Sequence, residues 1–313
     1  MTRPVILQMC ALSPKLDADL AERYEVIRGW EAPDQAALVR EHGDRIVGIA
    51  TAAPTGVPAD LLQSLPALKV VSCRGVGLDK IDLSIARDRG IQVSGTFGTL
   101  NDCVADLAFA LVLDVARHLS AADRYVRAGK WQKARYPLTA SVYGKRLGIV
   151  GLGQIGQQVA RRAGGFDMEI AYCNRRPVEG VGYRHESSLQ ALAQWCDFLV
   201  VTVAGSAETR HLIDADVLRA LGKDGYLINV ARGLVVDEAA LVSALTEGQI
   251  AGAGLDVFED EPNVPAELLE LDNVVLAPHM ASGTRETRAA MEALTLENLE
   301  RFFSEGKVKT PAF

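Results

Sequence analysis

The sequence lacks three features, each of which would point to a particular class of protein. It has no uninterrupted apolar run long enough to cross a membrane, and its first apolar stretch, residues 5–7, is far too short for a signal peptide. Positive charge is not in excess either, because the formal net charge is -7 at pH 7. A protein of this charge does not attract phosphodiester backbones. We therefore expect neither a membrane nor a nucleic acid as a partner.

The third missing feature is a pair of cysteines with metal-binding or redox spacing. The five cysteines are Cys10, Cys73, Cys103, Cys173 and Cys196, and no two of them form a C-x-x-C motif. An odd number of scattered cysteines favours reduced thiols over disulfides and over a zinc site. The expectation is therefore a cytoplasmic protein that holds no metal ion.

What the sequence does contain is a regular alternation of short apolar runs with helical patterns. This alternation predicts the α/β class, with parallel sheets and crossover helices. The strand candidates form two series: residues 5–7, 25–27, 46–50, 69–72 and 91–93, and then residues 147–150, 169–172, 198–203, 226–230, 252–256 and 274–276. A chain of 313 residues accommodates two domains, although a single large α/β domain is also compatible with that length.

Two long helical patterns define the predicted domain organisation. The first, residues 101–128, separates the two strand series, and its apolar residues recur at helical spacing. The second, residues 284–304, is long enough to return to the first domain. We therefore predict two doubly wound parallel-sheet domains: a discontinuous one of residues 1–98 plus 285–313, and a second one of residues 99–284.

A glycine-rich turn at residues 151–156 provides a candidate nucleotide site. An apolar strand enters the turn and a helix-compatible run leaves it, so backbone N–H groups at the helix start can face a pyrophosphate. This context favours a dinucleotide site over the alternative, a tight turn without a ligand. The predicted cofactor-binding residues here are Gly151, Gly153, Gln154, Ile155 and Gly156.

The second strand of this domain ends in Cys173-Asn174-Arg175-Arg176, without the acidic residue that would bond ribose hydroxyls in an NAD site. Asn174 keeps hydrogen-bonding capacity without negative charge, and the guanidinium of Arg175 or Arg176 can pair with a 2′-phosphate. We expect NADP(H) as the cofactor, with NAD(H) as the second choice. The competing interpretation is a solvated loop that happens to carry two arginines.

Two further residues follow strands directly, where doubly wound sheets bind ligands. Arg232 follows the strand at 226–230, and its guanidinium suits the carboxylate of a 2-oxo acid. His279 follows the strand at 274–276, and an imidazole can deliver a proton near neutral pH. The backbone N–H groups of Val76 and Gly77 could complete the anion site. The alternatives are a structural salt bridge for Arg232 and a strand cap for His279.

Taken together, the motifs resemble those of the D-isomer specific 2-hydroxyacid dehydrogenases over nearly the whole chain. The stretches that carry the resemblance are residues 76–79, 102–108, 151–156, 229–233, 254–262 and 277–279. Within the family, residues 174–176 and 282–288 most resemble those of the NADPH-dependent glyoxylate/hydroxypyruvate reductases and hydroxyphenylpyruvate reductases.

The resemblance implies a fold and a reaction. It implies a flavodoxin-like substrate domain, a Rossmann dinucleotide-binding domain, a cleft between them, and a homodimer. The implied reaction is NADPH-dependent reduction of a small 2-oxo acid, such as glyoxylate or hydroxypyruvate, to the D-2-hydroxy acid. In the family pattern the carboxylate of Glu261 lies against the imidazole of His279 and favours its charged form. The same pattern implies that Asp256 meets the nicotinamide carboxamide.

The sequence also departs from the family pattern. Residues 95–98 lack the Asn-Thr-Pro sequence that is common in the family before the first long helix, and Phe97 there could alter the hinge or crowd the nicotinamide. Arg74 occupies a position where relatives have smaller side chains, so it either binds a second acidic group of the substrate or points to solvent. Arg135 and Tyr136 are candidates for substrate specificity, since in relatives this region reaches the partner subunit.

Two alternatives to this function remain open. One is a cofactor-gated interaction protein, because corepressors share this fold. The sequence contains no stretch that resembles a disordered regulatory extension, which favours the enzyme. The other is a dehydrogenase of the same family for a bulkier or different acid, such as hydroxyphenylpyruvate.

Overall fold

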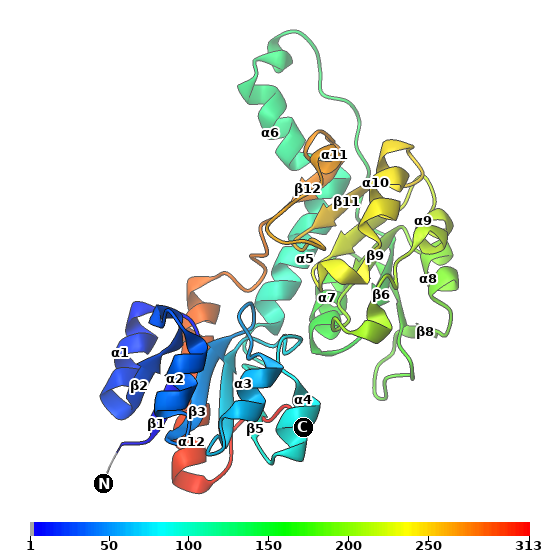
Figure 1. Ribbon diagram of the computed structural model, residues 1–313. Coiled ribbons are helices and arrows are strands. Elements are labelled where there is room, and N and C mark those ends of the chain that lie inside the picture. The colour runs from blue at the N-terminus through cyan, green and yellow to red at the C-terminus, as the bar shows by residue number, and fades with distance from the viewer. Residues whose placement is uncertain (1–2) are drawn as a thin grey trace. The chain divides into compact units, whose positions relative to one another are not determined.

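The computed structural model describes residues 3–313, which divide into two compact units (Figure 1). Unit 1 comprises the residues up to Leu100 together with Thr284–Phe313, and unit 2 comprises Asn101–Gly283. The sequence-based boundaries lie at 98/99 and 284/285. Within the described residues, no helix combines the length and the apolar character that a membrane-spanning segment requires.

Unit 1 is built on a five-stranded parallel sheet in the order β2-β1-β3-β4-β5, which is the flavodoxin-like order. The strands are β1 (Val5–Gln8), β2 (Glu25–Arg28), β3 (Ile46–Ala52), β4 (Val70–Arg74) and β5 (Gln92–Ser94). The helices are α1 (Pro14–Arg23), α2 (Gln35–His42), α3 (Ala59–Ser64), α4 (Leu83–Asp88) and α12 (Arg285–Glu305). The N-cap of the last helix is Thr284, whose side chain accepts the N–H of Thr287, and this helix packs on β4.

Unit 2 contains a seven-stranded parallel sheet in the order β12-β11-β10-β9-β6-β7-β8. The strands are β6 (Arg146–Val150), β7 (Glu169–Cys173), β8 (Arg184–Glu186), β9 (Phe198–Val201), β10 (Tyr226–Asn229), β11 (Gly252–Leu255) and β12 (Val274–Leu276). The helices are α5 (Asn101–Arg117), α6 (Leu119–Arg127), α7 (Gln154–Gly164), α8 (Leu189–Trp195), α9 (Ala215–Leu221), α10 (Glu238–Thr246) and α11 (Ala266–Leu269). This is the Rossmann order with one added strand, β12, so the predicted pair of parallel-sheet α/β domains is confirmed.

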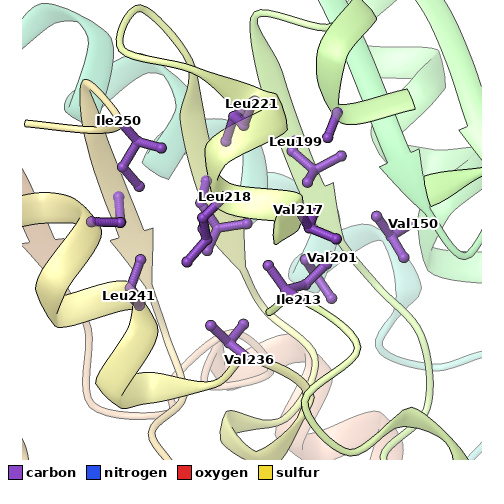
Figure 2. Packing of buried hydrophobic residues seen from close by; sticks show 14 of the residues in the cluster. Val150, Leu199, Val201, Ile213, Val217, Leu218, Leu221, Val236, Leu241 and Ile250 are labelled. Carbon is purple, nitrogen blue, oxygen red and sulfur yellow. The ribbon is translucent and has the colours of Figure 1, made fainter. Parts of the chain in front are cut away.

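The sheet of unit 2 is covered by helices on both faces. On one face α5 packs with α7, and Leu111 of α5 approaches Gly254 of β11, where a Cβ atom would lie only 2.9 Å from that of Leu111. On the other face, side chains of α9 and α10 such as Leu218 and Leu241 gather with Val201 against the strands (Figure 2). Burial of these apolar side chains fixes the strands, and therefore fixes the loops at their carboxyl ends.

The structure corrects two details of the predicted secondary structure. Residues 101–128 form two helices instead of one, because His118 adopts a left-handed backbone with φ of 53° between α5 and α6. The carboxylate of Asp114 accepts the N–H of Ser120 at 2.8 Å, which satisfies one orphan donor at the start of α6. Strand β8 was not predicted, because its sequence, Arg-His-Glu, contains no apolar run.

The carboxylate of Asp197 connects the start of β6, the strand that leads into the glycine turn, with the start of β9, its neighbour in the sheet. It accepts the backbone N–H and the guanidinium Nη2 of Arg146, both at 2.8 Å. Burial alone would raise the pKa of Asp197, but the hydrogen bonds and the charge of Arg146 outweigh it and hold that pKa below its ordinary value. A lowered carboxyl pKa contributes stability above the unfolded-state pKa of about 3.9, and this contribution is lost as the pH falls through the folded-state value.

We predict that Asp197→Asn lowers the free energy of unfolding by about 1–2 kcal/mol near neutral pH, since charge-assisted hydrogen bonds to a partly exposed arginine are lost. The difference between wild type and variant should shrink below about pH 4, where the wild-type carboxylate also becomes protonated. Urea unfolding of both proteins across this pH range measures the effect. A difference that is the same at all pH values would contradict the assigned role of the charge.

Candidate active site

The glycine turn is shaped by close backbone packing. It joins the end of β6 to Gln154, the first residue of α7, and Gly153 is the N-cap residue. Gly151 has a φ of 97°, and a Cβ atom there would lie 2.9 Å from the backbone nitrogen of Val203. A Cβ atom on Gly156 would lie 2.4 Å from the carbonyl oxygen of Gly151. Only glycine fits at these two positions, which is why the turn can be so tight.

The outer side of this turn fits the pyrophosphate of a dinucleotide. Among residues 3–313, no heavy atom beyond the two chain neighbours lies within 4 Å of the position that a Cβ atom on Gly153 would take, so the approach to the helix start is open. No described side chain caps α7, and the first-turn N–H groups at Gln154, Ile155 and Gly156 have no intrahelical acceptor. Open space in front of unpaired N–H groups is what a bound phosphate requires.

The end of β7 lies beside the turn in the sheet. The Oδ1 atom of Asn174 accepts the N–H of Leu152 at 2.7 Å, so this side chain fixes the glycine turn as well as bordering the site. Arg175 and Arg176 are both exposed. Arg175 Nη1 lies 3.1 Å from Glu208 Oε2, but the two side chains are 92% and 77% exposed, and such a pair contributes little free energy. A phosphate group can therefore replace Glu208 as the partner of Arg175.

A buried carboxylate organises the turn that follows β12. Asp256 is 1% exposed and accepts the N–H groups of Met280 and Ala281 at 2.7 and 2.9 Å. Its carbonyl oxygen accepts the N–H of His279 at 2.8 Å. Burial is the main cause of the raised pKa of Asp256, and the two N–H groups act against it. These contacts give Asp256 a structural task that the sequence did not reveal, and its contact with the nicotinamide stays a prediction.

The structure brings Glu261 and His279 together. Glu261 Oε2 lies 2.7 Å from His279 Nδ1, and Glu261 Oε1 accepts the N–H of Phe258 at 3.1 Å. His279 has a left-handed backbone with φ of 49°. The side chains of Glu261 and His279 are 34% and 43% exposed, so they are reachable from solvent. With Nδ1 bonded to the carboxylate, Nε2 is the ring nitrogen that can meet a ligand.

Arg232 lies one strand away from the Asp256 turn. It follows β10 and immediately precedes a short 3-10 turn, η4 (Gly233–Val235). The side chain of Asn229 fixes this segment, because its Nδ2 donates to the carbonyl of Arg232 at 3.0 Å and its Oδ1 accepts the N–H of Ala231 at 3.0 Å. Asn229 is 1% exposed and was not among the predicted site residues. In the sequence it stands at the end of an apolar strand and within residues 229–233, one of the stretches that carry the family resemblance.

The segment that carries Arg232 touches the loop that carries Glu261. A Cβ atom on Gly233 would lie 1.9 Å from the carbonyl carbon and oxygen of Phe258. The two backbones are therefore in direct contact, and neither loop can shift without the other. Since β10, β11 and β12 are adjacent parallel strands, the segments that follow them meet at one edge of the sheet.

The predicted residues of unit 1 lie at the carboxyl edge of its own sheet. Val76 and Gly77 follow β4 and are half-buried and buried, respectively. Arg74 does not point to solvent, because its side chain is 16% exposed, its Nη1 donates to the carbonyl of Leu12 at 2.7 Å, and Glu292 lies 3.5 Å away. Both contacts involve Nη1, and the Nε atom is buried without a hydrogen-bond partner in the described residues. A role of Arg74 in substrate binding stays a prediction. The ring of Phe97 packs on Gly95.

Arg135 and Tyr136 lie in the segment after α6. The ring of Tyr136 contacts that of Tyr125 edge-on, with 5.2 Å between the ring centroids. Arg135 is exposed. Tyr136 also lines a hollow of about 880 Å³ between α5, α6 and residues 136–143. Their role in substrate specificity stays a prediction.

Comparison with known proteins identifies the relatives of this chain. Residues 109–281 match the family model described as D-isomer specific 2-hydroxyacid dehydrogenase, NAD binding domain. A glyoxylate/hydroxypyruvate reductase of Arabidopsis thaliana is 45% identical over 306 residues, which cover 98% of each chain. A hydroxyphenylpyruvate reductase of Plectranthus scutellarioides is 44% identical over the same share of both chains.

A similar protein has been solved as a crystal structure. The NADPH-dependent glyoxylate/hydroxypyruvate reductase of Sinorhizobium meliloti, in complex with NADP and malonate, superposes with a TM-score of 0.93. It is 44% identical in sequence, and the match covers 99% of this chain and 97% of that one.

We predict that Gly233→Ala destabilises the protein by about 1–3 kcal/mol, because the added methyl group forces apart two backbones that are in contact. Gly164→Ala is the matched control, since no atom lies within 4 Å of the place that its methyl group would take at the end of α7. Thermal unfolding of both variants measures the difference. Equal stability of the two variants would show that the loops are not in contact.

Proposed function

Because the chain belongs to the D-isomer specific 2-hydroxyacid dehydrogenase family, we propose that it reduces a small 2-oxo acid, such as glyoxylate or hydroxypyruvate, to the D-2-hydroxy acid with NADPH. The observation that carries the proposal is the 2.7 Å contact between Glu261 and His279 at the carboxyl edge of a dinucleotide-type sheet. When bound, the reduced nicotinamide would supply the hydride for the carbonyl carbon.

The proposed proton donor is the charged imidazole of His279. Its Nδ1–H is bonded to Glu261, so Nε2–H is the donor for the carbonyl oxygen of the substrate. Glu261 stabilises the positive charge and fixes the ring, which is the task of a carboxylate behind a catalytic imidazole. As the proton leaves Nε2, the ring becomes neutral and takes up a new proton from solvent through its exposed edge.

Arg232 is the proposed anchor for the carboxylate of the substrate. A guanidinium can donate two parallel hydrogen bonds to one carboxylate, which fixes the orientation of the adjacent carbonyl group. The backbone N–H groups of Val76 and Gly77 are the proposed additional donors to that carboxylate.

The proposed preference for NADPH rests on charge at the end of β7. Asn174, Arg175 and Arg176 provide no carboxylate to repel a 2′-phosphate, and the two arginines offer guanidinium groups to bind it. The NADP complex of the Sinorhizobium meliloti reductase supports the same preference. Gly151, Gly153, Gln154, Ile155 and Gly156 are proposed to hold the pyrophosphate, and Asp256 the carboxamide.

We further propose a homodimer built on the α6 region, in a protein of the cytoplasm. Large apolar side chains are exposed there, and Leu119, Val126, Trp131, Leu138 and Tyr143 are each at least half exposed. Figure 1 shows α6 and the loop after it standing away from the sheet of unit 2. Several large exposed apolar side chains on one part of a protein are typical of a surface that contacts another protein.

The proposed function is tested by the oxidation of NADPH and NADH in the presence of glyoxylate, hydroxypyruvate or hydroxyphenylpyruvate. We expect turnover with a clear preference for NADPH. In the double variant Arg175→Ala/Arg176→Ala the Kd for NADPH should rise about 10- to 100-fold with little change for NADH, since charged hydrogen bonds to the 2′-phosphate are lost. Arg161→Ala, an exposed arginine of α7, is the control. Equal losses for both cofactors would contradict the phosphate assignment.

We predict that His279→Gln lowers kcat for reduction roughly 10²- to 10⁴-fold, because the general acid is lost. The Kd for NADPH should stay within about twofold, since this substitution leaves the glycine turn unaltered. Stopped-flow reduction and a fluorescence titration measure the two quantities separately. A rate close to that of the wild type would exclude His279 as the proton donor.

A further inference from the structure

Another imidazole–carboxylate pair is formed by His211 and Glu259, and Glu259 lies two positions before Glu261 in the chain. His211 Nε2 lies 3.0 Å from Glu259 Oε1, in a segment between η3 (Ala207–Thr209) and α9. The proposed reaction assigns no task to either residue. Both side chains are partly buried, with 34% and 27% exposed, and Nε2 of His211 is hydrogen-bonded to Oε1 of Glu259.

His211 links the two segments that carry the proposed site. Its backbone N–H donates to the carbonyl of Leu234 at 2.8 Å, in the η4 turn that follows Arg232. Its side chain reaches Glu259 in the loop that carries Glu261. His211 itself has a left-handed backbone with φ of 50°, a conformation that is kept only where surrounding contacts hold it.

Other charged groups on the neighbouring segments lie close to His211 and Glu259. Arg210 Nη2 lies 2.7 Å from the same oxygen of Glu259, and Asp237 Oδ2, just before α10, lies 3.8 Å from His211 Nδ1. The first residue of α10, Glu238, accepts the N–H of Glu259 at 3.1 Å. Burial is the main cause of the raised pKa of Glu238, and the charges of Glu259 and Asp260 add to it. Glu259 is thus held at both its backbone and its side chain.

The contacts continue from Glu259 to the reacting groups. The neighbouring residue, Phe258, donates its N–H to Glu261 Oε1 at 3.1 Å, and Glu261 Oε2 lies 2.7 Å from His279. A shift of Glu259 therefore moves Phe258, and with it the carboxylate that orients the imidazole. Small displacements of this kind are costly, since misplacement by about 1 Å can lower a rate about 100-fold.

We propose that His211 and Glu259 are positioning residues that hold residues 256–262 so that Glu261 stays bonded to His279. The inference rests on the proposed function, since it assigns the pair a task in orienting the proton donor. The proposed reaction gives neither residue a contact with the substrate or the cofactor. Loss of the pair impairs the proton donor and leaves substrate anchoring by Arg232 largely intact.

The test compares His211→Phe, His211→Gln and Glu259→Gln with His42→Gln. His42 is the matched control because it also lies beside a carboxylate, Glu41 at 3.5 Å, but on the surface of unit 1. In His211→Phe and Glu259→Gln we expect kcat to fall about 10- to 100-fold, with KM within about twofold. His211→Gln should recover part of the rate, because its amide can still donate to Glu259.

A spectroscopic readout separates positioning from simple loss of stability. The proton on His279 Nδ1, which lies 2.7 Å from Glu261 Oε2, is held in a hydrogen bond and should give a downfield signal in nuclear magnetic resonance spectra, assigned by its absence in His279→Gln. A displaced Glu261 breaks this bond, so the signal should weaken or disappear in His211→Phe and stay unchanged in His42→Gln.

The spectroscopic signal does not depend on turnover. If wild type does not reduce 2-oxo acids, the proposed function fails, yet loss of the signal in His211→Phe would still support positioning by His211. If wild type turns over and both the kcat and the signal of the variants match those of His42→Gln, the inference is overturned. Should His211→Phe fail to fold, Glu259→Gln and His211→Gln provide the same two readouts.

Discussion

The carboxylate of Asp256 is the contact on which the arrangement of the site depends. It accepts two backbone N–H groups, those of Met280 and Ala281, and its carbonyl accepts a third from His279. These bonds hold His279 in a left-handed conformation that the residue would not adopt alone. An ionised carboxylate with 1% exposure is costly to bury, and the N–H groups offset that cost. These bonds set the position from which the imidazole of His279 reaches Glu261.

The sheet of unit 2 explains why distant residues act together. The strands β10, β11 and β12 are parallel neighbours, so the segments after them share one edge. Asn229 fixes the first segment, Asp256 the second and third, and the contact between Gly233 and Phe258 joins the first two. The backbone of these segments is therefore held by buried contacts, while the side chains of Glu261 and His279 are reachable from solvent. This arrangement suits catalysis, because reacting groups must be held to within a fraction of an ångström while remaining accessible to the substrate.

Much of the fold could be predicted because its signals are local. Apolar runs in the sequence predicted eleven of the strands, and the glycine turn predicted the start of α7. Strand β8 has no apolar run, and the break at His118 depends on the side chain of Asp114, so neither was predicted. The pairing of Glu261 with His279 came from family resemblance, because 18 residues separate them and no local rule brings them together. Asn229, His211 and Glu259 were not among the predicted site residues, because the partners of their side chains are set by the fold and cannot be derived from the local sequence.

The central claim is the proposal that the reduced nicotinamide, when bound, would supply hydride to the carbonyl carbon while His279 supplies the proton to the oxygen. The most direct measurement is reduction of hydroxypyruvate or glyoxylate with NADPH that carries deuterium at the transferable C4 position, followed by mass spectrometry of the product. The account predicts one deuterium on C2 of the 2-hydroxy acid, and none there when the protium cofactor is used in deuterated water. Deuterium lost to the solvent, or taken up on C2 from it, would contradict direct transfer.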